Sequence, residues 1–312
     1  MISKLTGSSK SAVSKALNHC FGVDRENREK ILSAARENRV GAHRDCFVYI
    51  MLPDLPNFFW ENVLKKLLCL RGPADCKFNI YSRGSSFVLG EYLSEAERLK
   101  AGLLLIAIRP DAEQSELLRK FAKKVPIIFL IDRVDIPNTF YIGSDAYEDG
   151  AAIFDRVGLP DGARALLLDD GSLISDERAR GFSERGAGRI EIHRIRVPGE
   201  PNAASELARI ISASGITAPE LIYSCAGQLR ETALAAVKLN LRGRAAVAGH
   251  DFYDSRSFTP QSGGNISGVE FVSVNQNIDG ICRRAVGAVT EYVSDRRFPG
   301  EKYIRVPPAE KS

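Results

Sequence analysis

The chain has 312 residues, of which 44% are apolar and 26% are charged, and its net charge is +4. This composition is that of an ordinary globular protein, and it excludes disordered, collagenous and low-complexity chains. The length predicts two domains, since a domain usually holds roughly 100–200 residues. The longest apolar run, Ala101 to Ile108, is much shorter than the ~20 residues that a membrane span needs.

The first 45 residues form a basic head. They hold nine Lys and Arg against five Asp and Glu, whereas the charges of the remaining residues balance. Residues 9–18 have apolar side chains at helical spacing behind a possible N-cap, Ser9, and Asp24 can cap a further helix from Arg25 to Glu37. A basic head on a neutral body indicates an anionic partner, although a surplus of four charges also lies within ordinary fluctuation.

The pattern changes at Cys46 to alternating strands and helices. Val40 to Asp45 is a short linker, and the apolar run Phe47–Leu52, which ends at Pro53, is typical of a buried parallel strand. The alternation that follows predicts a doubly wound α/β layer. Helices are expected at 58–70, 91–100 and 111–122, and strands near 78–81, 103–108 and 127–131.

The pattern starts again after Asp145. Helices are expected at 147–157, 203–213, 229–239 and 278–294, and one more is expected to begin at 176. Strands are expected at 165–169, 190–197, 221–225, 245–248, 269–274 and 303–306. Two successive α/β units predict two similar lobes. Because ligands bind beyond the carboxyl ends of parallel strands, two facing lobes would enclose a ligand site.

The motifs of several large enzyme classes are absent. The sequence holds no GxGxxG, GxxxxGK[ST], GxSxG or HExxH, so no catalytic residue is predicted. Asp169 and Asp170 adjoin a strand end, but neighbouring residues of a strand point to opposite faces, so they do not form a pair for acid–base chemistry.

The cysteines and the start of the chain indicate a cytoplasmic protein. The six cysteines form no CxxC, and no His/Cys cluster has zinc spacing, so we expect reduced thiols and neither metal nor other cofactor. Residues 1–8 contain no apolar core of the length that a signal peptide has.

Leu5 to Asn18 fits a helix, a turn at Gly7 and a second helix. In a helix-turn-helix, the second helix lies in the major groove of DNA. Its polar face supplies the candidate DNA contacts, which are Lys10, Ser11, Ser14, Lys15 and Asn18. Lys can donate to guanine, and Ser and Asn suit phosphate oxygens. The alternative is the solvated polar face of a surface helix.

The stretch Leu5–Asn18, followed by Val23–Ala35, resembles the DNA-binding head of the lactose/galactose-repressor (LacI/GalR) family. Segments that resemble motifs of the family's body follow in the same order, and they are Pro53–Trp60, Ile131–Arg133, Gly143–Asp145, Arg178–Phe182, Gly249–Asp251 and Val274–Gln276. The resemblance implies a homodimeric transcriptional regulator, a repressor, with an α/β body like that of periplasmic sugar-binding proteins. A sugar or related effector in the cleft would change the affinity of the heads for operator DNA.

The resemblance also implies a division of the chain. Residues 1–45 would form the small all-α helix-turn-helix head, and residues 46–312 the two-lobed body with its two doubly wound parallel sheets. Lobe one would hold about 46–144 plus 278–298, and lobe two about 145–277 plus 299–312. By the family pattern, Lys10, Ser11 and Lys15 would face bases, while Ser14 and Asn18 would hold phosphates.

Four residues are implied effector contacts, namely Trp60, Arg178, Asp251 and Gln276. A guanidinium is a planar fork of donors that suits hydroxyls or a carboxylate, an indole face suits a sugar ring, and a carboxylate can accept hydroxyl protons. Three alternatives stay open at this point: a surface ion pair for Arg178, a place in the lobe core for Trp60, and a cap or turn for Asp251.

Three segments depart from the family pattern. Residues 1–5 supply only the last turn of the head's first helix, which predicts a start placed too far downstream or a degenerate, poorly packed head. Residues 40–45 leave no room for the hinge helix that wedges the minor groove in the family. Ala226 and Gly227 stand where the family has an Asn-Asp pair, so two polar contacts of a standard hexose site are missing.

Three hypotheses for the function follow. A regulator predicts salt-dependent binding to specific DNA. An effector-binding sensor with a vestigial head predicts effector binding without DNA binding. An α/β enzyme predicts turnover of the ligand in the cleft, but no motif supports it.

Overall fold

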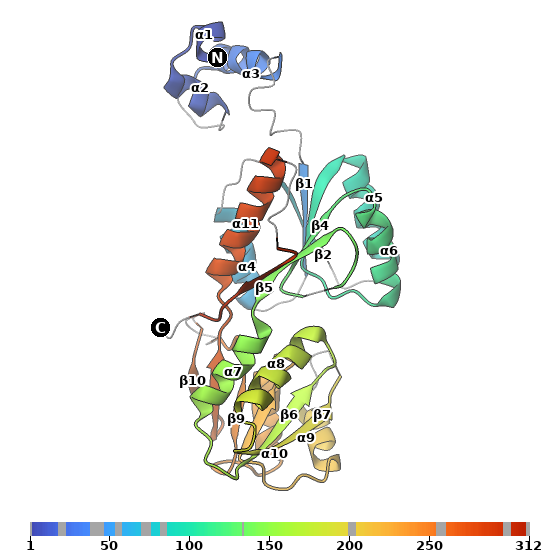
Figure 1. Ribbon diagram of the computed structural model, residues 1–312, viewed down its shortest axis with the longest axis vertical. Helices are drawn as coiled ribbons and strands as arrows, with labels where there is room; N and C mark the ends of the chain where they lie inside the picture. Colours follow the sequence, from blue (N-terminus) through green and yellow to red (C-terminus); the bar gives the residue numbers. More distant parts are fainter. Residues whose placement is uncertain are drawn as a thin grey trace.

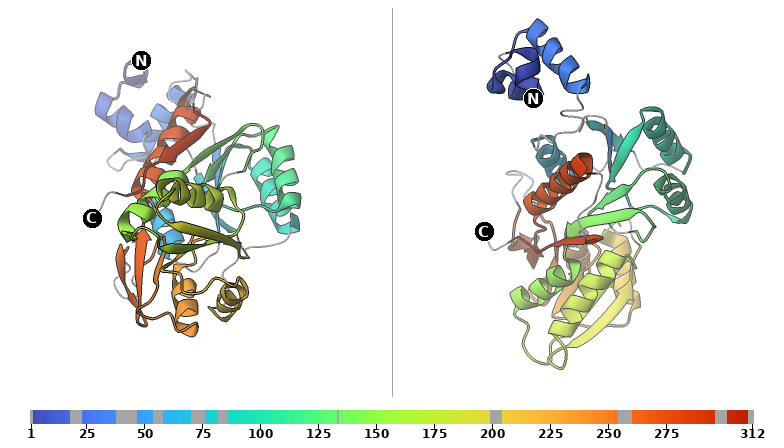
Figure 2. Two further views of the ribbon diagram at one scale, coloured as in Figure 1. Left: turned by 60° about the horizontal axis from the view of Figure 1, so that its bottom comes forward. Right: turned by 45° about the horizontal axis from the view of Figure 1, so that its top comes forward.

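The computed structural model describes residues 2–17, 23–37, 47–53, 58–69, 76–81, 86–132, 134–198, 204–253, 260–295 and 301–309. Three short helices come first, and two α/β lobes with a six-stranded sheet each follow. Figure 1 shows the helices beyond one end of the body and the two lobes one below the other, and the right-hand view of Figure 2 also separates the helices from the body. Two predictions fall outside the described residues. They concern Asn18 and the linker at 40–45, which was expected to be too short for a hinge helix.

The three N-terminal helices are α1 (Ile2–Thr6), α2 (Lys10–Leu17) and α3 (Arg25–Glu37). Both predicted caps are confirmed, because the Ser9 hydroxyl accepts from the N–H of Ala12 at 3.0 Å and the Asp24 carboxylate accepts from the N–H of Asn27 at 2.9 Å. Gly7, with φ +67°, makes the turn between α1 and α2. A small core holds the helices together, and its buried members are Ile2, Ala16, Ile31 and Ala35.

The first sheet has the strand order β12-β5-β4-β3-β1-β2, with all neighbouring strands parallel. Its strands are β1 (Phe47–Pro53), β2 (Cys76–Tyr81), β3 (Ala101–Ile106), β4 (Ile127–Leu130), β5 (Thr139–Ser144) and β12 (Tyr303–Val306). Its helices are α4 (Phe58–Cys69), α5 (Ser86–Arg98), α6 (Ala112–Ala122) and α11 (Ile278–Asp295).

The apolar run in β1 is explained by burial on both faces of this sheet. Val48, Ile50 and Leu52 pack in one core cluster with residues of α4 and α11. Tyr49 and Met51 pack in a second cluster with residues of α5 and α6. A strand between two helical layers needs apolar residues at every position, because successive side chains point to opposite faces.

The second sheet has the order β10-β11-β9-β8-β6-β7, and only β10 is antiparallel to its neighbour. Its strands are β6 (Arg164–Asp169), β7 (Glu191–Arg196), β8 (Leu221–Ser224), β9 (Ala246–His250), β10 (Gly263–Ile266) and β11 (Val269–Val274). One face packs on α7 (Ala146–Val157) and α8 (Leu173–Arg185), and the other on α9 (Ala204–Ala213) and α10 (Leu229–Lys238).

Two strands were not predicted, and one was assigned to the wrong lobe. The unpredicted strands are β5 and β10; β10 is Gly-Gly-Asn-Ile, mostly poor strand formers, whereas β5 begins with the strong strand formers Thr139–Ile142 and was overlooked. The placement of residues 299–312 in lobe two is wrong for β12, because β12 pairs with β5 in the first sheet. The N–H of Tyr141 donates to Lys302 O at 2.9 Å, and the N–H of Asp145 donates to Val306 O at 2.8 Å.

None of the described helices combines the length and the hydropathy needed to cross a bilayer.

Candidate functional site

The carboxyl ends of the two sheets face each other. The chain leaves β5 at Ser144 and enters α7 of the second lobe, and it leaves β11 at Val274 and enters α11 of the first lobe. Beyond β12, the N–H of Ala309 donates to Asn275 O at 3.1 Å in the second lobe. The chain thus passes from one lobe to the other after β5, after β11 and after β12. Each passage starts at the carboxyl end of a strand, where open α/β sheets hold their ligands.

A buried ion pair lies at this end of lobe two. The guanidinium Nη2 of Arg178 in α8 lies 3.5 Å from Oδ2 of Asp149 in α7, and Nη1 donates to the carbonyl oxygen of Cys225 at 3.2 Å. The side chain of Arg178 is 7% exposed and that of Asp149 is fully buried. Arg178 is one of the implied effector contacts, whereas Asp149 was not predicted from the sequence.

Two glycines bring the helices of this pair together. A Cβ on Gly150 of α7 would overlap the backbone oxygen of Arg178, and a Cβ on Gly181 of α8 would overlap the backbone oxygen of Tyr147. The two helices therefore touch backbone to backbone, as Figure 1 shows for their neighbouring ribbons. The Arg178-x-x-Gly181 spacing places the guanidinium and the contact glycine on the same helix face.

The Asp149 carboxylate is held from two sides. Its Oδ1 accepts a hydrogen bond from the Ser144 hydroxyl at 2.8 Å. Burial raises the pKa of Asp149 to about 7, although Arg178 and Ser144 act in the opposite direction. Desolvation disfavours the charged carboxylate by more than these two partners favour it.

Asp251 and Gln276 contact each other directly. Asp251 follows β9, and its carboxylate accepts from the backbone N–H of Gln276 at 2.8 Å and from Gln276 Nε2 at 2.5 Å. Its φ of +54° is uncommon for a residue other than glycine. Burial raises the pKa of Asp251, while Arg178 and Gln276 lower it. Because both oxygens are used within the protein, the interpretation as a turn residue fits as well as that of an effector contact.

Tyr223 and His250 complete the buried polar cluster. The Tyr223 hydroxyl and His250 Nε2 lie 2.7 Å apart in a hydrogen bond. Burial lowers the pKa of His250 well below its usual range, so the imidazole is neutral near pH 7. Arg178 is therefore the cation of this cluster, and Asp149 and Asp251 are its carboxylates.

Trp60 belongs to lobe one. It is half-buried on α4, packs against the lobe-one core and meets the ring of Phe59 edge-on at 5.1 Å. Tyr253 from lobe two packs against the same core and hydrogen-bonds Asn62, two residues along α4. The loop that starts at Asp251 thus reaches the helix of Trp60, which connects the predicted effector residues of both lobes.

Polar side chains from both lobes line an interlobe pocket of about 310 Å³. Lobe one contributes Arg109, Asp132 and Asp135, and lobe two contributes the start of α8, Gly171–Ile174. Nη1 of Arg109 binds Oδ2 of Asp170 at 2.6 Å across the lobes. The four predicted effector residues do not line this pocket.

Asp169 and Asp170 diverge, as predicted from their positions on the strand. Asp169 accepts from Arg194 at 2.7 Å and from Arg196 at 3.2 Å on the neighbouring strand, whereas Asp170 accepts from Arg109 of the other lobe. The two carboxylates therefore serve separate ion pairs.

The predicted DNA-contact face lies on α2. Lys10, Ser11, Ser14 and Lys15 are exposed, whereas Ala16 of the same helix is buried in the head core. The four side chains therefore belong to the outer face of the helix.

Sequence reasoning missed three residues of the site, which are Asp149, Arg109 and Tyr253. Asp149 lies four residues before the buried Ile153, so its place on the apolar face of an amphipathic helix is a signal that could have found it. Arg109 follows β3 closely, and polar residues after parallel strands are candidates for a cleft. Nothing in the local sequence distinguishes Tyr253.

No protein-family model matches the sequence, and no curated protein matches it. Solved structures do match the fold. A LacI-family transcriptional regulator from Silicibacter pomeroyi is 17% identical, with 98% of this chain and 95% of that chain covered and a TM-score of 0.58. The Lac repressor bound to ONPG is 15% identical, with 99% and 96% covered and a TM-score of 0.62.

A sugar-binding protein is similar over a shorter part of the chain. GanP, a glucose-galactose binding protein from Geobacillus stearothermophilus, is 16% identical, with 85% of this chain and 96% of that chain covered and a TM-score of 0.65. At these identities the structural similarity establishes the fold alone, a two-lobed body like that of periplasmic binding proteins. The neighbours named are transcriptional regulators and sugar-binding proteins, not enzymes.

Proposed function

We propose that this chain is a cytoplasmic, DNA-binding transcriptional regulator, a repressor, whose affinity for an operator is changed by a sugar-like molecule bound between the lobes. The observation that carries the proposal is the combination of a three-helix head with a body of the sugar-binding fold. A solute-binding protein needs only the second of these parts.

The extent of the structural similarity supports the head as part of the function. The Lac repressor and the Silicibacter pomeroyi regulator are similar over 99% and 98% of this chain, respectively, whereas GanP is similar over 85%. The Lac repressor has also been solved as a dimer bound to operator.

The chemistry of α2 fits a nucleic-acid surface. Lys10 and Lys15 are exposed cations on the outer face of a helix that follows a tight turn. In this geometry, Lys side chains reach phosphates or guanine edges of the major groove. We also propose DNA contacts for Ser11, Ser14 and Asn18, as the resemblance implies.

The chemistry of the interlobe site fits a polyol. Arg178, Asp251 and Gln276 supply donors and acceptors at the carboxyl end of lobe two, and Trp60 of lobe one supplies an aromatic face. A hydroxyl both donates and accepts, so a sugar can satisfy a mixed set of this kind. The ring of Trp60 can cover the apolar face of the sugar.

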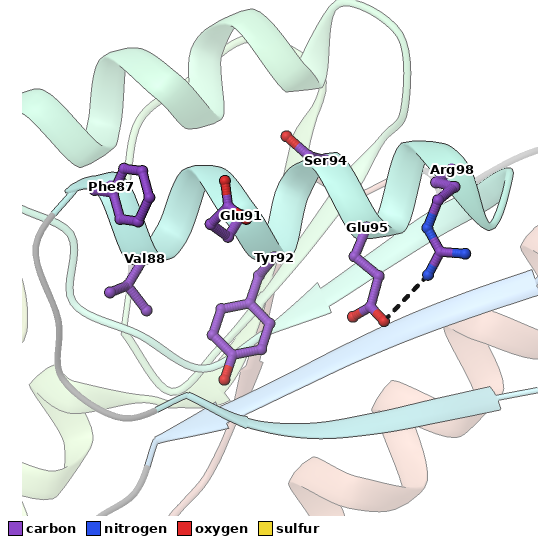
Figure 3. Close-up of a pocket in the computed structure, with 7 residues that line it drawn as sticks. All are labelled: Phe87, Val88, Glu91, Tyr92, Ser94, Glu95 and Arg98. Atoms are coloured by element: carbon purple, nitrogen blue, oxygen red, sulfur yellow. Dashed lines mark ion pairs between the residues drawn. The ribbon is translucent and has the colours of Figure 1, made fainter.

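One exposed face of α5 has the features of an interface with a second copy of the chain. Phe87 is 74% exposed, and it lines a groove of about 540 Å³ with Val88, Tyr92 and Glu95. Figure 3 shows these side chains on one side of the helix, with Arg98 paired to Glu95. The neighbouring β2 is an edge strand of the first sheet. Exposed aromatic surface beside a sheet edge is typical of an interface between chains, so we propose a homodimer through this face.

DNA binding is the first test. Fluorescence anisotropy would measure binding of the chain to DNA from upstream of its own gene across a salt series, with Lys15→Ala as the variant and Lys124→Ala as the control. Lys124 is an exposed cation of lobe one that pairs with Glu97. We expect binding to weaken steeply with salt, and Lys15→Ala to cost about 1–3 kcal/mol of DNA affinity if Lys15 contacts a base.

Two outcomes separate the proposal from its alternative. Specific binding that Lys15→Ala weakens and Lys124→Ala leaves unchanged supports the regulator. Sugar binding without specific DNA binding would instead identify an effector-binding sensor with a vestigial head.

A further inference from the structure

The buried pair of Asp149 and Arg178 leaves two polar atoms without a hydrogen-bond partner among the described residues. These atoms are Oδ2 of Asp149 and Nε of Arg178. Oδ2 lies 3.5 Å from the nearest guanidinium nitrogen, within ion-pair range, but it accepts no hydrogen bond. Buried polar atoms are almost always hydrogen-bonded, so an unmatched acceptor and donor in one ion pair need an explanation.

A ligand hydroxyl matches the unpaired donor of this pair. It can accept a hydrogen bond from Nε–H of Arg178, while Oδ2 of Asp149 stays within ion-pair range of Nη2. The other donor of Arg178, Nη1, is fixed on the carbonyl of Cys225. The guanidinium is therefore oriented from two sides, by Cys225 and by Asp149.

Titratable groups of α8, β5, β8 and β9 surround the Asp149–Arg178 pair. Arg178 and Glu177 belong to α8, and Tyr141 belongs to β5 beside Ser144. Tyr223 comes from β8, and His250 and Asp251 come from the end of β9. Both tyrosines are neutral near pH 7, since burial raises pKa values that already lie above 7, and His250 is neutral because burial lowers its pKa.

We propose that Asp149 is the positioning residue of the effector site: its ionised carboxylate holds Arg178 in the orientation that binds an effector hydroxyl, and protonation of this carboxyl releases Arg178. The inference rests on the proposed function, since it assigns a regulatory group to the same site. It makes effector affinity a function of pH in the physiological range.

The direction of the pH dependence follows from the burial of Asp149. Its pKa is raised to about 7. Above that pH the carboxylate is ionised and holds the guanidinium, so effector affinity is high and constant. Below that pH, each further pH unit lowers the ionised fraction of Asp149 by up to tenfold, and effector affinity falls by the same factor. Asp251, the other carboxyl near Arg178, accepts two hydrogen bonds from Gln276.

Nuclear magnetic resonance tests the pair without any ligand. Side-chain carboxyl ¹³C signals and arginine ¹⁵Nε signals would be followed from pH 5 to 9 in the full chain, with Asp149→Asn to assign the carboxyl. We expect Asp149 to titrate with a midpoint near 7 and the Arg178 Nε signal to move with the same midpoint. An Asp149 midpoint below 5, or an Arg178 signal that does not follow it, overturns the inference.

Calorimetry tests the consequence for binding. The probes are D-glucose, D-galactose, D-allose, cellobiose and fructose 1-phosphate, at pH 5.5, 6.5, 7.5 and 8.5. The control variant is Asp155→Asn, which removes an exposed carboxylate on the same helix that pairs with Arg185 at 2.9 Å. We expect a sugar that binds the wild type to lose up to tenfold in affinity for each pH unit below 7, and to lose it equally in Asp155→Asn.

In Asp149→Asn we expect weak, pH-independent sugar affinity. The same pH profile in wild type and Asp149→Asn overturns the inference and leaves the proposed function intact. Failure of every sugar to bind at any pH, together with specific DNA binding, overturns the sugar-effector part of the proposed function and the inference with it.

Discussion

The two lobes share the same strand order over five of the six strands in each sheet, but they bury different kinds of side chain. The order β2-β1-β3-β4-β5 of lobe one corresponds to β7-β6-β8-β9-β11 of lobe two. Among the described residues, every buried Asp, Arg or His lies in lobe two, and the buried polar side chains of lobe one are uncharged. The same topology thus serves two roles. Lobe one has an apolar core and an exposed edge strand, β2, whereas lobe two holds the charged cluster of the candidate site.

Removing the buried cation should have the largest effect. Arg178→Ala leaves the fully buried Asp149 without its counter-charge, so we expect the free energy of unfolding at pH 8 to fall by about 3–5 kcal/mol. Lys124→Ala, which breaks an exposed pair in lobe one, should change it by less than about 0.5 kcal/mol. Urea unfolding measures both variants, and equal losses would contradict the contrast between the lobes.

Crowding the helix contact of lobe two should have the next largest effect. In Gly150→Ala the new methyl group meets the backbone of Arg178, so we expect a loss of about 1–3 kcal/mol. Gly90→Ala on α5 of lobe one is the matched control, because a Cβ there meets nothing within 4 Å. The control should gain about 0.5–1 kcal/mol from helix propensity. Thermal unfolding of both variants shows whether the change in unfolding free energy has opposite signs in the two lobes.

Breaking the ion pair between the lobes should have a smaller effect on stability. Arg109 is one-third exposed, and its partner Asp170 is almost fully buried. We expect Arg109→Ala to cost about 1 kcal/mol of unfolding free energy and to widen the angle between the lobes. Small-angle X-ray scattering would detect the opening, and an unchanged radius of gyration would argue against a role of this pair in holding the lobes together.

Removing the exposed ring of lobe one should leave folding unchanged. Phe87 is mostly solvent-exposed, so Phe87→Ser should alter the free energy of unfolding of the monomer by less than about 0.5 kcal/mol. In the homodimer that we propose, the same change should raise the dimer dissociation constant by at least tenfold. Analytical ultracentrifugation decides this, and a Phe87→Ser dimer as tight as the wild type would exclude the α5 face as the interface.

Local signals in the sequence predicted most of the elements correctly. The helix Arg25–Glu37, its cap at Asp24 and the buried strand Phe47–Leu52 follow from side-chain period and cap chemistry. Such signals lie within a few residues of each other, so a single segment carries them. β10 has a weak signal of this kind, whereas β5 was missed although Thr139–Ile142 are good strand formers.

The candidate site was predicted in part. Asp251 and Gln276 were proposed together, and they are in contact through two hydrogen bonds. Arg178 was proposed as a ligand contact, with a surface ion pair as the alternative; the ion pair that it forms is buried, and its role as a ligand contact stays a prediction. Its partner Asp149 was not predicted, because the pairing depends on how closely two helices approach.

The sequence by itself determined the alternation of strands and helices, the two successive α/β units and the polar outer face of α2, because periodicity and capping act between near neighbours. Only the tertiary structure decided that β12 joins the first sheet, that Tyr253 reaches α4, and that Asp149 holds Arg178. Each of these contacts joins residues far apart in the chain. The packing, the ladder hydrogen bonds and the low-dielectric surroundings that strengthen the ion pair exist only once the lobes have formed.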